Sequence, residues 1–212
     1  ITTDEIQFLT GKMIGVELVP DWSYQTLFRP LLFRLPSRVA RSLTLHAMRR
    51  VSRLPGGALL IKTLGHMEPS PLLEGQIAGI AVPTPIGLSG AVDPTGLAHR
   101  AISSFGIGFI EIGPITVEPI KNSQPIQNHW QQQETIIYPS EYENEGLIRM
   151  LPVLDNPSHP LPQFARVAPH PGASIQQSLD ELRLLFDTIG LTSAAGFYVD
   201  LWSFARSEQQ NL

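Results

Sequence analysis

Strand-length apolar runs alternate with helical patterns through most of the chain after residue 72. Asp93 and Pro94 fit the N-cap and first position of one helix, which should run to about Ser104 with Leu97, Ala101 and Ile102 facing inward. Strands that alternate with helices usually pair in parallel, because each helix carries the chain back to the start of the next strand. The sequence therefore predicts an α/β fold around a parallel sheet, with strands at residues 77–82, 86–88, 109–112, 164–168 and 197–202.

A second helix is indicated between the last two predicted strands. Ser174 or Ser178 would cap its start, and Gly190 would close it. The inward positions of this helix are predicted to be Leu179, Leu182, Leu185, Phe186 and Ile189.

The polar stretch 118–145 is predicted to be a loop or a hairpin.

The segment 23–67 contains no Asp or Glu, although the chain as a whole has a formal net charge of −4. A short helix is predicted at residues 24–33, and a longer one after Ser37. On the longer helix an apolar stripe recurs every three or four positions, at Val39, Leu43, Ala47, Val51 and Leu54. Such a basic, amphipathic pair of helices could lie on an anionic membrane surface, dock on a protein partner or remain solvated. The arginines of this segment are Arg29, Arg34, Arg38, Arg41, Arg49, Arg50 and Arg53.

Several functional classes find no support in the residues. The chain has no cysteine, and its six histidines lack the spacing of a metal site. No apolar run approaches the roughly 18 residues of a membrane-spanning helix, and no nucleic-acid motif accompanies the basic segment. The first residue is Ile1, so we expect a processed chain or a piece of a longer one.

Residues 82–119 read VPTPIGLSGAVDPTGLAHRAISSFGIGFIEIGPITVEP. This stretch resembles, without gaps, the quinone-linked, membrane-associated dihydroorotate dehydrogenases. The resemblance implies a partial (β/α) barrel, similar to the first half of a TIM-type barrel and preceded by an N-terminal helical pair. It implies the following division of the chain: a lead-in at 1–22, a basic amphipathic helical extension at 23–67, and the partial barrel at 68–212.

The resemblance also implies positions for a flavin site. In the family, flavin mononucleotide (FMN) lies at the carboxyl-terminal mouth of the barrel, and Ser203 matches the family's catalytic base. Pro94 replaces a lysine that binds substrate, and Ile148, Asp200 and Ala205 replace asparagines of the substrate site. The positions that match flavin-contacting residues, if FMN is bound, are Ser89, Gly90, Ala91, Gly113 and Thr116.

These replacements favour a catalytically inactive module, used as a structural or interaction unit at a membrane or in a larger complex and binding no cofactor. Two alternatives stay open: a fragment of a divergent FMN-dependent, quinone-linked dihydroorotate dehydrogenase, and a lipid- or quinone-binding module without redox chemistry. Half a barrel leaves a strand edge unpaired, so we expect a protein partner or further chain to complete it. The helical pair predicts peripheral contact with an anionic membrane or a quinone, and no nucleic-acid partner is expected.

Overall fold

The computed structural model describes residues 29–65, 69–121, 127–128, 136–137, 143–156 and 159–200. The chain divides into two compact units, residues 1–40 and 41–212. The described part of the first unit holds the short helix α2 (Arg29–Leu32) and the start of α3 (Ser37–Arg53). The predicted helix at 24–33 is therefore confirmed over α2, and residues 24–28 lie outside the described residues.

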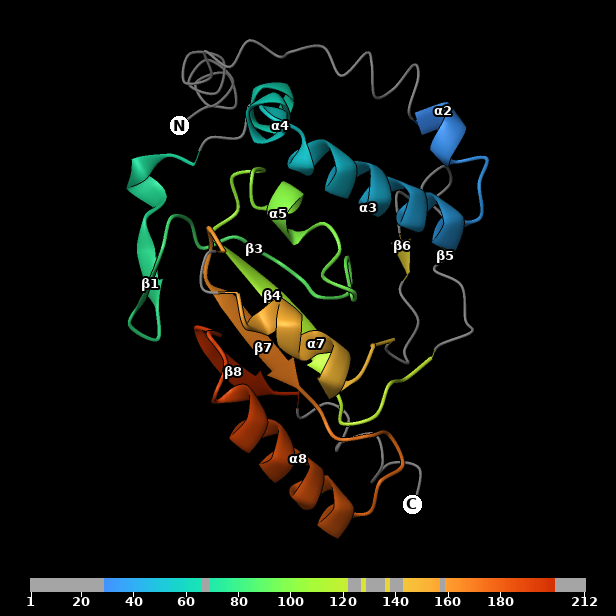
Figure 1. Cartoon of the computed structure of the whole chain (residues 1–212), viewed down its shortest axis with the longest axis vertical. Coiled ribbons are helices and arrows are strands. Elements are labelled where there is room, and N and C mark those ends of the chain that lie inside the picture. The colour runs from blue at the N-terminus through green and yellow to red at the C-terminus, as the bar shows by residue number, and fades with distance from the viewer. Residues whose placement is uncertain are drawn as a thin grey trace, which may run out of the picture. The chain divides into compact units, whose positions relative to one another are not determined.

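Four parallel strands form the main sheet of the second unit, in the order β3-β4-β7-β8 (Figure 1). The strands are β3 (Gly87–Leu88), β4 (Phe109–Ile115), β7 (Gln163–Val167) and β8 (Gly196–Val199). A helix lies in each crossover: α5 (His99–Ile102), α7 (Leu147–Leu154) and α8 (Ile175–Ile189). This repeated strand-helix order confirms the predicted parallel α/β fold, and the sheet does not close into a barrel within the described residues.

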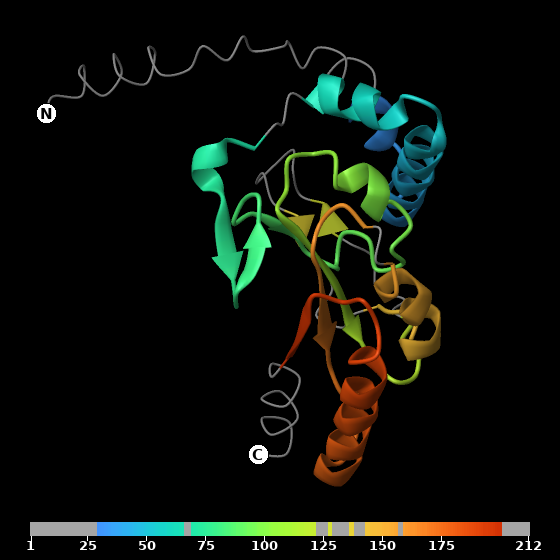
Figure 2. The same ribbon diagram turned by 60° about the vertical axis from the view of Figure 1, so that its left-hand side comes forward.

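The hydrophobic core lies between one face of this sheet and the helices α7 and α8. Figure 2 shows both helices on the same side of the strands. Alternate residues of a strand point to opposite faces, so one set is buried here and the other faces away. The core comprises Ile110, Ile112, Ile115, Ala165 and Val167 of the strands with Leu147, Met150, Leu154, Leu182, Leu185 and Ile189 of the helices.

Ser174 caps α8, and Ser178 lies buried inside the helix. The Ser174 hydroxyl accepts the Gln177 backbone N–H, while the Gln177 side chain accepts the Ser174 backbone N–H. This reciprocal capping box satisfies two backbone donors that would otherwise lack partners. The helix ends at Gly190, as predicted. Leu179 is 55% exposed, however, because it lies outside the arc of α8 that contacts the sheet.

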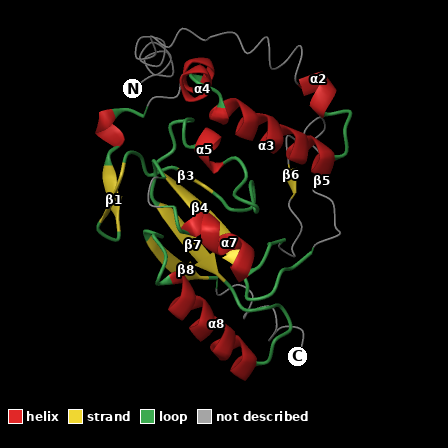
Figure 3. Ribbon diagram, in the orientation of Figure 1, coloured by secondary structure: helices red, strands yellow, loops and turns green. Residues whose placement is uncertain are grey.

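The predicted single strand at 77–82 is wrong, because two strands occupy this region (Figure 3). The strands β1 (Gly75–Ile77) and β2 (Ile80–Val82) pair antiparallel in a small hairpin. Ala78 and Gly79 both have positive φ, at 49° and 81°. Two such residues make the tight turn that suits a two-residue hairpin. A second hairpin within 118–145 joins β5 (Gln127–Asn128) and β6 (Ile136–Ile137). For that stretch the sequence predicted a loop or a hairpin, and the hairpin is confirmed.

The helix predicted to begin at Asp93 begins only at His99. Gly96 has a φ of 66°, outside the helical region, so the backbone between Pro94 and Ala98 turns instead. The Asp93 carboxylate accepts the Ala98 backbone N–H at 2.7 Å, five residues along the chain. Asp93 thus secures this turn just before α5, although not as the N-cap that the sequence indicated.

Helix α3 buries a narrow face and leaves its apolar stripe in the open. Leu45 packs against Ala98 and Ile102 beside α5. On the stripe, Leu43 is 50% exposed and Leu54 is 62% exposed. The next helix, α4 (Gly57–Gly65), is followed by the short 3-10 helix η2 (Pro71–Leu73). Across the described residues, no helix combines the length and the apolar character that a bilayer crossing requires.

Candidate functional site

A carboxylate at the middle of β4 organises the open face of the sheet. One oxygen of Glu111 accepts the Gly90 backbone N–H at 3.1 Å and the Ser89 hydroxyl at 3.3 Å. The other oxygen accepts the Tyr198 hydroxyl. Only 14% of the Glu111 side chain is exposed, so these bonds compensate a largely buried charge. The turn that follows β3 is thereby fixed to two neighbouring strands.

Arg166 lies on the same open face, beside Tyr198 in the strand register. Its guanidinium is 3.5 Å from the Glu111 carboxylate and 3.9 Å from that of Asp200. The Arg166 Nε atom is buried and has no hydrogen-bond partner among the described residues. We call Glu111, Arg166, Tyr198 and Asp200 the inner-face cluster. It holds two carboxylates, one guanidinium and an N–H donor that has no acceptor in the described part of the chain.

The pKa of Tyr198 is raised well above its ordinary value, first by burial. The hydrogen bond to Glu111 and the charge of that carboxylate raise it further. The Tyr198 phenol therefore keeps its proton at neutral pH and donates a hydrogen bond to Glu111.

Two glycines bring backbone segments into contact next to this cluster. A Cβ atom added to Gly90 would lie 2.1 Å from the Gly113 carbonyl oxygen, closer than any real contact. Gly90 is therefore required where the turn after β3 approaches β4. With Ser89 and Ala91 on either side, the turn presents only small side chains.

The structure brings four of the five predicted flavin-contacting residues together, and it engages the fifth elsewhere. Thr116 is fully buried just beyond β4, where its hydroxyl contacts the Asn144 side-chain oxygen at 3.0 Å and the Glu118 carbonyl. Asn144 also accepts the Gly146 backbone N–H at 2.8 Å. The described role of Thr116 is thus to fasten the start of α7.

The described residues that match the family's substrate site lie on different parts of the fold. Ser203 and Ala205 lie outside the described residues. Ile148 is 82% exposed on α7, so its side chain faces away from the sheet. Pro94 lies in the loop between β3 and α5, and Asp200 directly follows β8.

No motif in the sequence pointed to Glu111, Arg166 or Tyr198 as a group. The signal available in the sequence is that each of the three is a polar residue between apolar neighbours in a strand. A polar side chain in a buried strand indicates a face that is not simply hydrophobic core. Their proximity, however, depends on the strand order and register.

Two histidines and an aspartate form a buried group away from the inner-face cluster. The His99 ring lies 3.9 Å from the Asp93 carboxylate and 6.4 Å, between ring centres, from His159. Burial lowers the pKa of both histidines, while Asp93 partly opposes the shift at His99. Within the described residues, no three His, Cys, Asp or Glu side chains are arranged to hold a metal ion.

The arginines of the basic segment have different surroundings. Arg29 lies over the Phe33 ring at 5.5 Å. Arg41 forms a 2.9 Å ion pair with Glu143, which is far away in the sequence. Arg34, Arg50 and Arg53 are exposed, whereas Arg38 and Arg49 are half-buried.

No family model matches the sequence, but individual proteins do. A dihydroorotate dehydrogenase (quinone) of Chloroflexus aurantiacus is 31% identical over 172 residues, which are 77% of this chain and 46% of that protein. The protein of the same name from Deinococcus deserti is 32% identical over 124 residues, or 58% of this chain and 34% of the relative. The chain thus spans about half the length, or less, of these relatives.

Solved structures are similar to this chain in fold. Ligand-free DHODH from Eimeria tenella superposes with a TM-score of 0.55 at 21% identity, over 68% of this chain and 44% of that one. The same enzyme in complex with ferulenol gives a TM-score of 0.53. This structural likeness shows the fold, and the sequence identity shows the relationship. The chain is therefore a divergent relative of the quinone-class dihydroorotate dehydrogenases that corresponds to about half of their length.

Proposed function

We propose that this chain supplies part of the flavin and substrate site of a divergent dihydroorotate dehydrogenase, with the remainder of the barrel supplied by further polypeptide. The observation that carries the proposal is the turn 89–91, which Glu111 fixes at the open face of a parallel sheet. In α/β barrels and open α/β sheets, cofactors and substrates bind at the carboxyl ends of the strands.

The described residues fit the ring portion of flavin mononucleotide. The turn Ser89–Gly90–Ala91 carries no bulky side chain, which allows a planar ring to approach the backbone. The buried Arg166 Nε atom lacks an acceptor among the described residues, and a carbonyl oxygen or ring nitrogen of a flavin would supply one. FMN, when bound, would accept the hydride that leaves the substrate.

Within that site, the residues of the inner-face cluster would orient the bound ring and would not react. Arg166, with Glu111 and Asp200 beside it, would hold its N–H donor toward the bound ring. Tyr198 keeps its proton and stabilises the ionised Glu111. Ser203, which follows β8 in sequence and lies outside the described residues, is the proposed proton acceptor on the substrate side.

A complete site requires a continuation of the sheet beyond β8. This strand pairs only with β7 among the described residues, and its side chains Phe197 and Tyr198 are 44% and 42% exposed. An open edge with exposed aromatic residues is stabilised by further strands. We therefore keep the prediction that more of the same polypeptide, or a partner, covers this edge.

Helix α3 supports contact with a membrane surface or quinone. Its exposed apolar residue Leu43 lies on the same helix as Arg50 and Arg53, and the exposed Leu54 directly follows that helix. Apolar side chains bordered by arginines suit the headgroup region of an anionic bilayer. Peripheral association of this kind stays a proposal for this chain.

The test is a flavin and activity measurement on the polypeptide as the cell produces it. We expect a visible flavin absorbance band that bleaches with dihydroorotate and returns with a soluble quinone. Arg166→Leu should weaken FMN binding, whereas Arg183→Leu, an exposed residue of α8, should not. A polypeptide that binds no FMN at high concentration would end this proposal.

A second candidate function is an inactive scaffold. Two observations favour it: the identity of Pro94, and the hydrogen bonds by which the turn 89–91 already donates to Glu111. Pro94 occupies the position of the family's substrate-binding lysine and has neither charge nor N–H. The Ser89 and Gly90 donors are already bound to Glu111. FMN binding without bleaching by dihydroorotate, or no binding at all, would favour this candidate.

A further inference from the structure

A cavity of about 660 Å³ lies at the end of the sheet opposite to the inner-face cluster. Its wall includes Pro83, Ile107 and Leu161, which stand just before β3, β4 and β7, respectively. Residues 89–91 and Asp200, in contrast, follow their strands. We call this space the basal cavity, and its position makes it separate from the proposed flavin site.

The lining of the basal cavity combines basic and apolar residues. Among the described residues of the lining, the ionisable ones can all carry a positive charge: Lys62, Arg100 and His159. No Asp or Glu of the described part of the chain belongs to this lining. The apolar part is made by Ala58, Pro69, Pro83, Ile107, Pro160 and Leu161.

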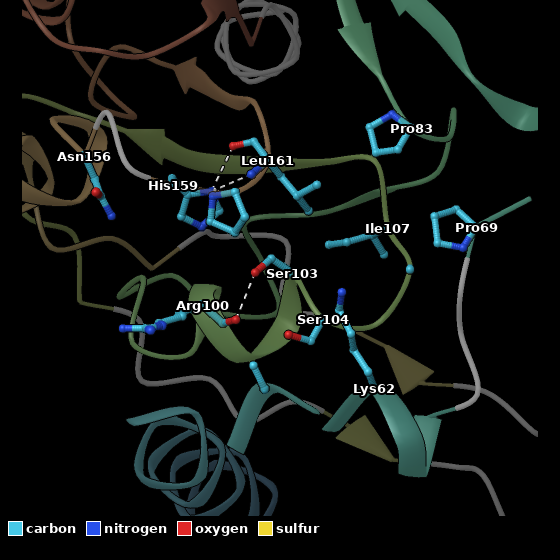
Figure 4. Close-up of a pocket in the computed structure, with 13 residues that line it drawn as sticks. Lys62, Pro69, Pro83, Arg100, Ser103, Ser104, Ile107, Asn156, His159 and Leu161 are labelled. Carbon is cyan, nitrogen blue, oxygen red and sulfur yellow. Dashed lines mark hydrogen bonds between the residues drawn. The ribbon is translucent and has the colours of Figure 1, made fainter. Parts of the chain in front are cut away.

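Lys62 provides one of the positive charges of the lining. Figure 4 shows its side chain rising from α4 toward Ser104 and Ile107. In the described part of the chain, Lys62 forms no ion pair. A lysine beside hydroxyls and an apolar surface is a point-charge donor for an anionic group.

His159 forms a neutral part of the wall. Its Nδ1 atom lies 2.8 Å from the Leu161 carbonyl oxygen and 3.3 Å from the Leu161 backbone nitrogen. Burial lowers the pKa of His159. The positive charge of the cavity at neutral pH therefore comes from Lys62 and Arg100.

We propose that the basal cavity binds a small amphipathic anion, in which one phosphate or carboxylate group is carried on an apolar body. The volume lies within the range of about 300–1,000 Å³ that is typical of small-molecule sites. Lys62 and the hydroxyl of Ser104 bind the anionic group, and Ile107 and Leu161 contact the apolar body. Such a ligand could be a soluble metabolite or a single-chain lipid.

Calorimetry on the full 212-residue chain tests this proposal. The probes are phenyl phosphate for a soluble ligand, lysophosphatidate below its micelle concentration for a lipid, and inorganic phosphate for the charge alone. We expect one of the two organic probes to bind at least about tenfold more tightly than inorganic phosphate. The tighter organic probe identifies the source, and added FMN should displace neither.

Three variants make the result specific to this cavity. Lys62→Gln should weaken binding of the organic probe by roughly tenfold, whereas Lys121→Gln, an exposed lysine outside the lining, should leave it unchanged. Ala58→Trp should block binding by filling the space, and the exposed position of Ala58 makes it compatible with folding. Equal effects of the two lysine variants, or binding no tighter than that of inorganic phosphate, would overturn the proposal.

Discussion

The carboxylate of Glu111 accepts the backbone N–H of Gly90 at 3.1 Å, which joins the turn after β3 to the middle of β4. The two residues are 21 positions apart in the chain. The same carboxylate binds Tyr198 and lies beside Arg166, so one side chain connects β4 with groups on β7, β8 and the turn.

Replacing Glu111 with Ala should lower the free energy of unfolding by at least about 2 kcal/mol, because a buried donor that loses its acceptor costs about 1–3 kcal/mol. Gly90 and Arg166 both lose a partner in this variant. Urea unfolding followed by circular dichroism measures the change. The matched control is Glu145→Ala, which breaks an exposed pair with Arg149. Such a pair contributes about 0–1 kcal/mol, and similar losses in both variants would contradict the role of Glu111.

Gly90→Ala should destabilise the protein, because its new Cβ atom would meet backbone atoms of Gly113 at 2.1 Å and 2.7 Å. Backbone cannot move aside as a flexible side chain does, and overpacking of this kind costs roughly 1–3 kcal/mol. Thermal unfolding of Gly90→Ala and of Gly75→Ala gives the comparison. A Cβ atom at Gly75 meets nothing within 4 Å, so that variant should unfold close to the wild type. Equal melting temperatures for the wild type and both variants would show that the turn after β3 does not pack tightly against Gly113.

The free energy of unfolding should fall as the pH is lowered, because His99 and His159 resist protonation in the folded protein. Burial lowers the pKa of His99 and His159 in the folded protein. The unfolded chain takes up protons at the ordinary histidine pKa of about 6.5, whereas the folded chain resists protonation. The stability that the two neutral histidines contribute is therefore complete above a pH of about 6.5. It is lost as the pH falls toward the lowered pKa that each histidine has in the folded protein.

Urea titrations at a series of pH values between about 7.5 and 5 measure this loss. His99→Leu should flatten the dependence, because it removes a group whose two ring nitrogens have no hydrogen-bond partner among the described residues. His170→Leu changes an exposed position and serves as the control. An unchanged slope in His99→Leu would exclude His99 as the source.

Binding to vesicles of anionic lipid should weaken when Arg49, Arg50 and Arg53 are replaced by Gln. Each basic residue near such a surface contributes on the order of 1 kcal/mol, and added salt should reduce the wild-type binding further. Vesicle co-sedimentation at several salt concentrations measures both effects. Replacing Arg149 and Arg183, exposed residues on α7 and α8, should have little effect. Equal loss in the two sets of variants would point to nonspecific charge attraction.

Local patterns were sufficient for the elements that carry their own signals. The strand at 109–112 and the helix after Ser174 are present because β-rich apolar residues and a capping box act over a few neighbouring positions. The ungapped stretch 82–119 also indicated the family, and the relationship of this chain to dihydroorotate dehydrogenases confirms that prediction. The assignment of an inactive module is not tested by these findings and stays a prediction.

Tertiary structure decided what local patterns could not. The sequence alone predicted one strand where Ala78 and Gly79 make a turn, and a helix from Asp93 where Gly96 adopts a positive φ. The backbone at Gly96 depends on a contact far away in the sequence, because an added Cβ atom there would lie 2.5 Å from the Val153 side chain of α7. The same holds for the inner-face cluster: each residue type is visible in the sequence, but only parallel pairing of β4, β7 and β8 places Glu111, Arg166 and Tyr198 on one face. Side-chain alternation is local, whereas strand order and register are set by how distant apolar residues pack together.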